Sequence, residues 1–241
     1  MKGVICAGGK GTRLYPLTYA TNKHLLPVYD KPMIYYPIQT LVKAGVTEIL
    51  IVVSGQHAGH FIPTLKNGAD FGISHVEYAY QEKPNGGIAD AISMAERFAD
   101  KEPITVILGD NTTDADISEP VKSFKDGALV FLKQVSDPMR FGVPRFDPND
   151  ITKIAEIIEK PKNPPSDFAV TGLYIYDNTV FDAIRACTPS DRGELEITDV
   201  NNVYVKKNTL RWAKLEGYWS DAGTFDSLLA ANNYWAGKRK Q

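Results

Sequence analysis

The sequence predicts an α/β fold in which a doubly wound, mixed sheet is flanked by helices. Short runs of β-branched and aliphatic residues, typical of buried strands, occupy 4–7, 49–53 and 105–108. Residues 88–98 instead repeat their apolar side chains at helical spacing. Strand and helix signals that alternate in this way indicate a Rossmann-like layer, whose ligands lie beyond the carboxyl ends of the strands.

The second half of the chain is less regular. Strand-like runs occupy 128–133, 154–158 and 169–176, with a proline-rich stretch at 160–165. We expect one domain over residues 1–241, with one half at about 1–125 and a second half at about 126–241 packed on it. A helical stretch follows at 225–235, and we expect the basic tail Lys238-Arg239-Lys240 to be solvated.

Composition excludes several classes of protein. The net charge of −2 is too close to zero to indicate a nucleic-acid or membrane partner. Two cysteines, Cys6 and Cys187, provide no disulfide framework. No stretch is apolar enough to span a bilayer, and the early strand after Lys2 does not resemble a signal peptide. We therefore expect a cytoplasmic protein.

A glycine loop follows the first predicted strand. Residues 4–7 lead into Gly8-Gly9-Lys10-Gly11-Thr12-Arg13, and Lys23 comes soon after. Glycines let backbone N–H groups approach an anion closely, and the Arg13 guanidinium offers a fork for phosphate oxygens. Gly-Gly alone would be equally consistent with a tight turn, but the neighbouring cations favour a polyphosphate site.

Two better-known glycine motifs do not fit this loop. In a Walker A loop ending at Gly9-Lys10, the first glycine would fall at Val4 and the Ser or Thr at Gly11. A dinucleotide fingerprint that starts at Gly9 would need glycine at Leu14. The loop is therefore neither a P-loop nor the fingerprint of a nicotinamide-dependent oxidoreductase.

Further motifs follow the glycine loop and are distributed along almost the whole chain. They comprise Gly8-Gly9-x-Gly11-Thr12-Arg13-Leu14-x-Pro16-x-Thr18, Lys23-x-Leu25-Leu26-Pro27-Val28, Asp30-Lys31-Pro32-Met33-Ile34, 81–89, Leu108-Gly109-Asp110-Asn111, Arg140-Phe141-Gly142-Val143, Glu159-Lys160-Pro161, Val170-Thr171-Gly172-Leu173-Tyr174, 193–199 and Trp219-Ser220-Asp221-Ala222-Gly223-Thr224. In this order the motifs resemble those of the sugar-1-phosphate nucleotidyltransferase family. The resemblance implies the nucleotidyltransferase fold, with a nucleotide-binding first half and a sugar-binding second half.

The same resemblance implies a reaction. A thymidylyl group would pass from dTTP to α-D-glucose 1-phosphate by direct in-line attack, giving dTDP-glucose and pyrophosphate with Mg²⁺ as cofactor. Such a product feeds the synthesis of deoxysugars such as dTDP-rhamnose and of surface polysaccharides. Uridylyl transfer from UTP to glucose or N-acetylglucosamine 1-phosphate stays open. So does a catalytically inactive nucleotide-sugar sensor, although the cations and aspartates described next argue against it.

The resemblance assigns the charged residues. Arg13 would hold the β- and γ-phosphates, Lys23 the α-phosphate and the leaving pyrophosphate, and Lys160 the phosphate of the incoming sugar. Asp110, at the end of a predicted strand, and Asp221 would bind Mg²⁺. An aspartate in the position of Asp110 is otherwise often only a turn former. No histidine, cysteine or serine is placed as a covalent nucleophile.

Base and sugar contacts also follow from the resemblance. The nucleotide would contact the loop residues Gly8, Gly9, Gly11 and Thr12, and beyond them Gln81, Pro84, Gly86 and Gly87, with Gln81 reading the pyrimidine edge. The turn after Gln81 departs from the family pattern, so either Gly86 or Gly87 can be the base contact. Gly142, Glu159, Val170 and Tyr174 would line the hexose, with a structural salt bridge as the alternative for Glu159.

Longer relatives continue past the Asp221 motif with helices that form an effector site and subunit contacts. This chain resembles the short members of the family, so we expect no control through such a site. We also expect an oligomer smaller than a tetramer, with a homodimer as the candidate, although an interface has no one-dimensional signature.

Overall fold

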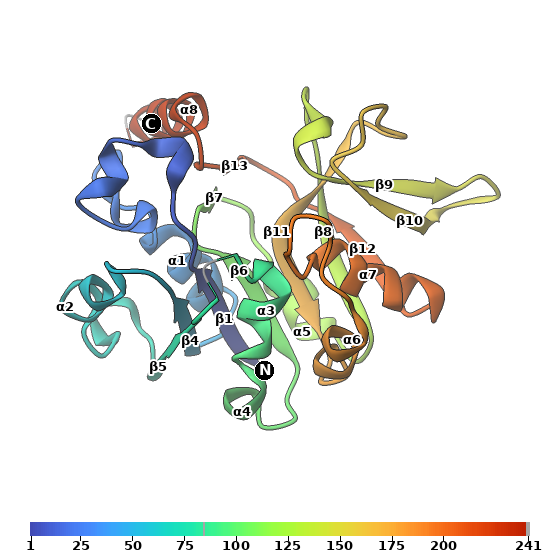
Figure 1. Cartoon of the computed structure of the whole chain (residues 1–241), viewed down its shortest axis with the longest axis horizontal. Coiled ribbons are helices and arrows are strands. Elements are labelled where there is room, and N and C mark those ends of the chain that lie inside the picture. The colour runs from blue at the N-terminus through green and yellow to red at the C-terminus, as the bar shows by residue number, and fades with distance from the viewer. Residues whose placement is uncertain (84, 240–241) are drawn as a thin grey trace.

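A mixed nine-stranded sheet forms the centre of the computed structural model, which describes residues 1–83 and 85–239 (Figure 1). The main path of the sheet runs β10-β9-β11-β6-β1-β4-β5, and β8 branches from β11 and pairs in turn with β12. The strands of this sheet are β1 (Lys2–Ala7), β4 (Glu48–Val53), β5 (His75–Tyr80), β6 (Ile104–Leu108), β8 (Ala128–Gln134), β9 (Gly142–Asp147), β10 (Asp150–Glu159), β11 (Phe168–Tyr176) and β12 (Leu210–Lys214). The predicted mixed α/β fold is thus confirmed.

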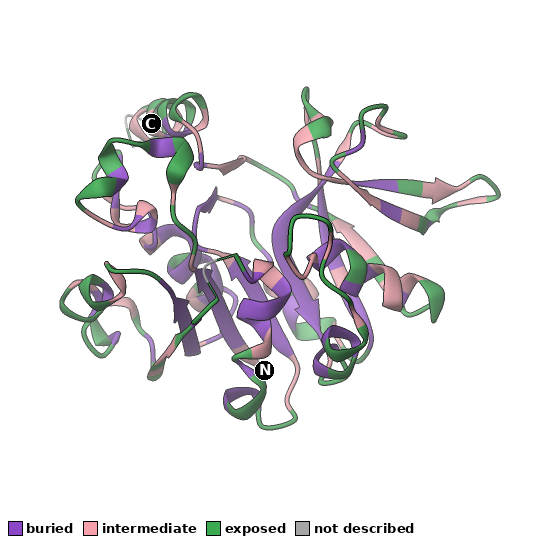
Figure 2. Cartoon of the chain, viewed as in Figure 1, coloured by how far each residue is buried: buried purple, intermediate pink, exposed green. Residues whose placement is uncertain are grey.

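Four parallel strands, β6, β1, β4 and β5, make up the first part of the sheet. The crossovers between them carry α1 (Tyr35–Lys43), α2 (Phe61–Leu65), and the pair α3 (Gly87–Ser93) and α4 (Glu96–Ala99). Because alternate residues of a strand point to opposite faces, Val4 and Cys6 pack under α3 and α4 while Ile5 and Ala7 pack under α1 and α2. Buried strands between partly exposed helices are plain in Figure 2.

The second part of the sheet is mainly antiparallel. β11 pairs with β6 over residues 173–176 and with β8 along much of its length, so one sheet joins the two halves of the chain. β9 and β10 form a long hairpin beside it. Further elements are α5 (Ser118–Ser123), α6 (Val180–Ala186) and α7 (Ile197–Lys206), together with the short pairs β2 (Pro27–Val28) with β3 (Lys31–Pro32) and β7 (Asn111–Thr113) with β13 (Trp219–Asp221).

The prediction of one continuous helix over 88–98 is wrong, because the structure divides this segment into α3 and α4. Met94 N–H donates to the Ala91 carbonyl and Ala95 N–H to that of Ile92, three residues back in each case. These bonds tighten the chain into a turn between the helices. Apolar periodicity cannot distinguish such a turn from continuous helix, because the same residues, Ala91, Ile92 and Ala95, are buried in both.

The last helix, α8 (Phe225–Lys238), packs against the segment that follows the glycine loop. A capping box formed by Thr224 and Ser227 starts the helix, and Trp235 lies 4.6 Å, centroid to centroid, from Tyr36. The tail is not simply solvated as expected: Lys238 pairs with Asp114, and Arg239 pairs with Asp30 at 2.5 Å. Lys240 lies outside the described residues.

None of the helices formed by the described residues has the length and apolarity needed to cross a membrane.

Candidate active site

A cleft of about 590 Å³ lies at the carboxyl ends of the parallel strands. The segments that follow β1, β5 and β6 each contribute lining residues, as does the antiparallel half through β9, β10 and β11. Its volume is in the range of small-molecule pockets. The cleft therefore lies across the junction between the two halves, where α/β sheets usually bind their ligands.

The glycine loop forms one wall of this cleft. Gly8 and Gly9 line it, and Gly9 N–H donates to Ser54 Oγ at 2.9 Å. Gly9 has φ +96° and Gly11 has φ +63°, which are left-handed values that favour glycine. Gly11 and Thr12 line an adjoining hollow, and Arg13 faces both spaces. The loop thus places backbone and one guanidinium beside the cleft.

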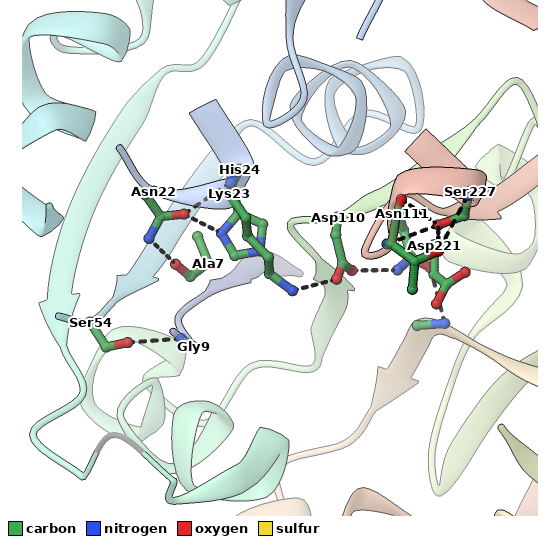
Figure 3. Close-up of polar contacts among 12 residues, drawn as sticks. Ala7, Gly9, Asn22, Lys23, His24, Ser54, Asp110, Asn111, Asp221 and Ser227 are labelled. Atoms are coloured by element: carbon green, nitrogen blue, oxygen red, sulfur yellow. Dashed lines mark hydrogen bonds and ion pairs between the residues drawn. The ribbon is translucent and has the colours of Figure 1, made fainter. Parts of the chain in front are cut away.

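Lys23 and Asp110 both line the cleft and contact each other (Figure 3). Lys23 Nζ lies 2.5 Å from Asp110 Oδ2. Burial alone would raise the pKa of the Asp110 carboxyl, but the Lys23 ammonium and the hydrogen bonds from Lys23 and Asn111 hold that pKa well below its usual range. Asp110 is therefore an ionised carboxylate paired with a cation.

The turn that carries Lys23 is held by its neighbours. Asn22 Oδ1 accepts from His24 N–H at 2.9 Å and lies 2.7 Å from His24 Nδ1 (Figure 3). His24 is 1% exposed and packs against the turn before Asp110, so a Cβ on Gly109 would come within 2.8 Å of the imidazole ring. Burial, and then the Lys23 charge, lower the pKa of His24 to about 3. The imidazole is thus a neutral support beneath the Lys23–Asp110 pair.

Asp221 reaches the same region from the other end of the chain. It pairs with Asn111 in the β7–β13 ladder, and Ala222 N–H donates to the Asp110 carbonyl at 2.8 Å. Burial and the Asp110 charge raise the pKa of Asp221 to about 6, against the opposing effect of Arg140. Arg140 lies 3.1 Å from Asp221 Oδ2. The two aspartates predicted as a pair are therefore brought together.

This pair of carboxylates fits a divalent cation that shares its shell with phosphates. Mg²⁺ is usually bound by one or two carboxylates plus substrate phosphate oxygens and water. Both carboxylates attract positive charge here, since each lies against a Lys or Arg side chain. No group of three or more metal-ligating side chains occurs in residues 1–83 and 85–239. Asp110 and Asp221 could therefore hold a metal only together with ligands that a substrate brings.

Gln81 lines the cleft beyond the glycine loop, at the end of β5. Its Nε2 donates to Asp90 Oδ2 at 2.8 Å and to the Gly87 carbonyl at 3.1 Å. Gly87 lines the cleft and Gly86 does not, so of the two glycines Gly87 is the one placed to touch a base. Pro84, the remaining predicted contact, lies outside the described residues. Cys6 also lines this end, and burial raises the pKa of its thiol to about 12.

The antiparallel half contributes a charged wall. All the predicted sugar-side residues line the cleft, namely Gly142, Glu159, Lys160, Val170 and Tyr174. Glu159 accepts from Thr198 Oγ1 at 2.6 Å and lies 3.0 Å from Lys160 Nζ and 3.5 Å from Arg192. Glu159 therefore forms the salt bridges that the structural alternative predicts, and it also faces the cleft.

Sequence reasoning assigned no role to several residues that the structure places in this cleft. They are His24, Asn111, Arg140, Arg192, Glu194, Glu196, Thr198 and Trp219. Arg192 lies 2.8 Å from Glu196 and 3.5 Å from Glu159. Six of them, Asn111, Arg140, Glu194, Glu196, Thr198 and Trp219, fall within the motifs identified above, and this was the only indication that the sequence offered. Arg192 lies just before such a motif, and nothing in the sequence indicated a role for it.

Comparison with known proteins gives a family. Residues 2–237 match the family described as "Nucleotidyl transferase". The chain is 43% identical over 240 residues to a protein of Neisseria meningitidis serogroup A and 44% identical over 239 residues to one of Xanthomonas campestris pv. campestris. In both comparisons 97% of this chain is covered, with 82% and 80% of the respective relative. Both relatives are named glucose-1-phosphate thymidylyltransferase.

Solved structures agree with this result. A Bacillus anthracis protein, provisionally assigned as a glucose-1-phosphate thymidylyltransferase, superposes with a TM-score of 0.91 at 47% identity, covering 97% of this chain and 94% of that one. A UDP-glucose pyrophosphorylase in complex with UDP-glucose superposes with a TM-score of 0.86 at 24% identity, covering 98% of each chain. At that identity the second likeness concerns the fold alone.

Proposed function

The chain belongs to the nucleotidyl transferase family, and on that premise we propose that it transfers a thymidylyl group from dTTP to α-D-glucose 1-phosphate. The products are dTDP-glucose and pyrophosphate. One observation carries the proposal: a single cleft holds two adjacent carboxylates between a glycine loop with Arg13 and a second cationic wall. That arrangement suits two phosphorylated substrates that react across a metal.

The nucleotide is proposed to lie along the parallel half. Gly8, Gly9 and Gly11 leave room for phosphate oxygens, while Arg13 and Lys23 supply positive charge. Gln81 and Gly87 line the same cleft, with Gln81 next to Gly8, and there a base fits against bare backbone. This order places the triphosphate near Asp110 and the base near β5.

Asp110 and Asp221 are the proposed ligands of Mg²⁺. When bound, the ion would neutralise charge on the phosphates and so make the approach of a second anion possible. Lys23 and Arg140, which lie against these carboxylates in this structure, are free to turn toward phosphate oxygens once another cation takes their place.

The sugar phosphate is proposed to bind the antiparallel half. Lys160 and Arg192 are cations of that wall, and Glu159 lies between them. A carboxylate that already accepts from Thr198 keeps further acceptor sites for sugar hydroxyls. Val170 and Tyr174 line the floor beside it and offer an apolar surface to the face of a hexose.

Catalysis then needs positioning and charge and no covalent intermediate. A phosphate oxygen of the sugar attacks the α-phosphorus in line, the bond from that phosphorus to the oxygen bridging to the β-phosphate breaks, and pyrophosphate leaves with that oxygen. Arg13 and Lys23 stabilise the charge that builds on the leaving group. The Cys6 thiol, with its raised pKa, is unsuited to act as a nucleophile.

Pyrophosphate release tests the proposal. The purified protein with Mg²⁺ is assayed against dTTP, UTP, dCTP and ATP, each with glucose 1-phosphate and N-acetylglucosamine 1-phosphate. We expect the highest kcat/KM with dTTP and glucose 1-phosphate. A preference for UTP would favour the uridylyltransferase alternative, and binding of dTTP without turnover of any pair would favour a nucleotide-sugar sensor.

A further inference from the structure

The side-chain amide of Gln81 is held in one orientation by two acceptors. Nε2 lies 2.8 Å from Asp90 Oδ2 and 3.1 Å from the Gly87 carbonyl oxygen. Neither a carboxylate nor a carbonyl can donate a hydrogen bond, so only the NH₂ group of the amide can face them. The oxygen, Oε1, must therefore point the other way, toward Gly8 and the cleft, where a Cβ on Gly8 would lie 2.8 Å from it.

We propose that Asp90 determines base specificity by fixing this orientation, an inference that rests on the proposed function. Thymine and uracil present an N3–H donor beside the O4 acceptor, whereas cytosine presents an N3 acceptor beside an N4–H₂ donor. An acceptor at Gln81 Oε1 matches the N3–H of thymine and opposes N3 of cytosine. Rotating the amide by half a turn would reverse this match.

The residues around Asp90 shield its contact with Gln81 from water and leave room for it. Asp90 is 8% exposed and Gln81 is 5% exposed, so their hydrogen bond is shielded from water. Gly86 leaves the space the pair needs, since a Cβ there would lie 2.3 Å from Asp90 Oδ2 and 2.9 Å from Gln81 Nε2. The other carboxylate oxygen, Oδ1, lies 4.0 Å from Lys83 Nζ, which is largely exposed. Gly86 therefore serves the Gln81–Asp90 pair and not the base itself.

Asp90→Asn tests the inference with little change of shape. An asparagine amide can offer either oxygen or nitrogen to Gln81, so only the Gly87 carbonyl still favours the original orientation of Gln81. We expect the ratio of kcat/KM for dTTP to that for dCTP to fall at least tenfold, and the ratio of their dissociation constants, measured by calorimetry, to fall with it. Glu96→Gln is the control, because Glu96 pairs with Arg185 at the surface, and it should leave both ratios unchanged.

A second, double variant exchanges the amide and the carboxylate between positions 81 and 90. In Gln81→Glu/Asp90→Asn, the asparagine amide at position 90 can donate to the new carboxylate, which again presents only acceptors to the base. The Gly87 carbonyl loses the donor that it has in Gln81 Nε2, and this loss is expected to lower activity. Selectivity for dTTP over dCTP should return, with lower activity. Equal loss of dTTP and dCTP turnover in Asp90→Asn, or an unchanged ratio, would overturn the inference. Calorimetry reads the base preference without turnover, so an inactive wild-type enzyme would contradict the proposed function separately.

Discussion

The two walls of the cleft are built in different ways. On the parallel side, residues that directly follow strands face the ligand space, and Arg13 forms no ion pair with any residue in the described ranges. On the antiparallel side, cations and carboxylates pair among themselves: Lys160 and Arg192 both contact Glu159, and Arg192 also contacts Glu196. The parallel wall is thus fixed by the ends of strands and by separate pairs such as Lys23 with Asp110. The antiparallel wall is fixed by a network of side chains that share partners.

This difference bears on how each wall responds to change. A position fixed by the backbone survives the loss of one neighbour, whereas an ion-pair network rearranges when one member is removed. We therefore expect substitutions on the parallel side to act mainly on the chemistry, and substitutions on the antiparallel side to act mainly on sugar binding.

The largest effect is expected at the carboxylates between the walls. Asp110→Asn and Asp221→Asn should each lower kcat/KM at least about a thousandfold, or ~4 kcal/mol, because the lost charge acts at the reacting phosphate. The double variant should be little worse than either single one. Steady-state kinetics measure the loss, and circular dichroism monitors the fold.

Asp126→Asn is the matched control for these variants, since Asp126 is an exposed carboxylate paired with Arg211. It should retain wild-type activity. Wild-type turnover by Asp110→Asn or Asp221→Asn would remove that residue from the metal site.

A smaller effect is expected from His24, which supports the parallel wall. Its pKa is about 3 when folded and near the usual 6.5 when unfolded, so the unfolded chain binds more protons between these values and stability falls as the pH drops below about 6.5. The loss between pH 7 and pH 4 should be roughly 3 kcal/mol. Urea unfolding of wild type and His24→Asn measures it. The pH dependence should be flatter in the variant, and the exposed His60→Asn should match wild type.

On the antiparallel wall, Lys160→Met should raise the KM for glucose 1-phosphate roughly ten- to hundredfold, the size of a charge-assisted hydrogen bond. The KM for dTTP should change little, because Lys160 belongs to the opposite wall. Lys162→Met, an exposed lysine two residues on, is the control. Equal increases in both KM values would show that the two walls do not divide the substrates as proposed.

A smaller effect again concerns the base. Thymine and uracil differ by one methyl group, which is worth about 1–3 kcal/mol in a pocket. Comparing dTTP with dUTP measures the effect of that methyl group alone, because both nucleotides carry deoxyribose. UTP should be a measurable, weaker substrate. A preference for dTTP over dUTP in kcat/KM beyond roughly a thousandfold would require a contact that the cleft does not provide.

The same contrast between the walls explains what could be predicted from sequence. Gln81 directly follows β5, and Asp110 follows the apolar strand β6 after Gly109, and the strand-end rule places such residues together. Arg192 lies in a loop before α7, and Arg140 in a short turn before β9. No periodicity marks either residue, and their places depend on antiparallel pairing between distant segments, which a single sequence does not reveal.

Asp90 shows a further limit. On a helix predicted from its apolar spacing, an aspartate in the first turn is expected simply to favour the helix dipole. Only the packing of α3 against the end of β5 brings its carboxylate to the Gln81 amide. The fold was predictable because strand and helix patterns repeat. The contact between Asp90 and Gln81 was not, because it depends on a single side chain where α3 packs against the end of β5.

The pairing of β6 with β11 has a consequence for motion. Residues 104–107 and 173–176 are joined by a continuous ladder in the buried centre of the sheet, directly beneath the cleft. A hinge that opened the two halves would have to break this ladder, so substrate entry and product release depend on the loops at the rim. Amide hydrogen exchange in these two strands should stay slow with or without nucleotide, and fast exchange there would indicate a hinge.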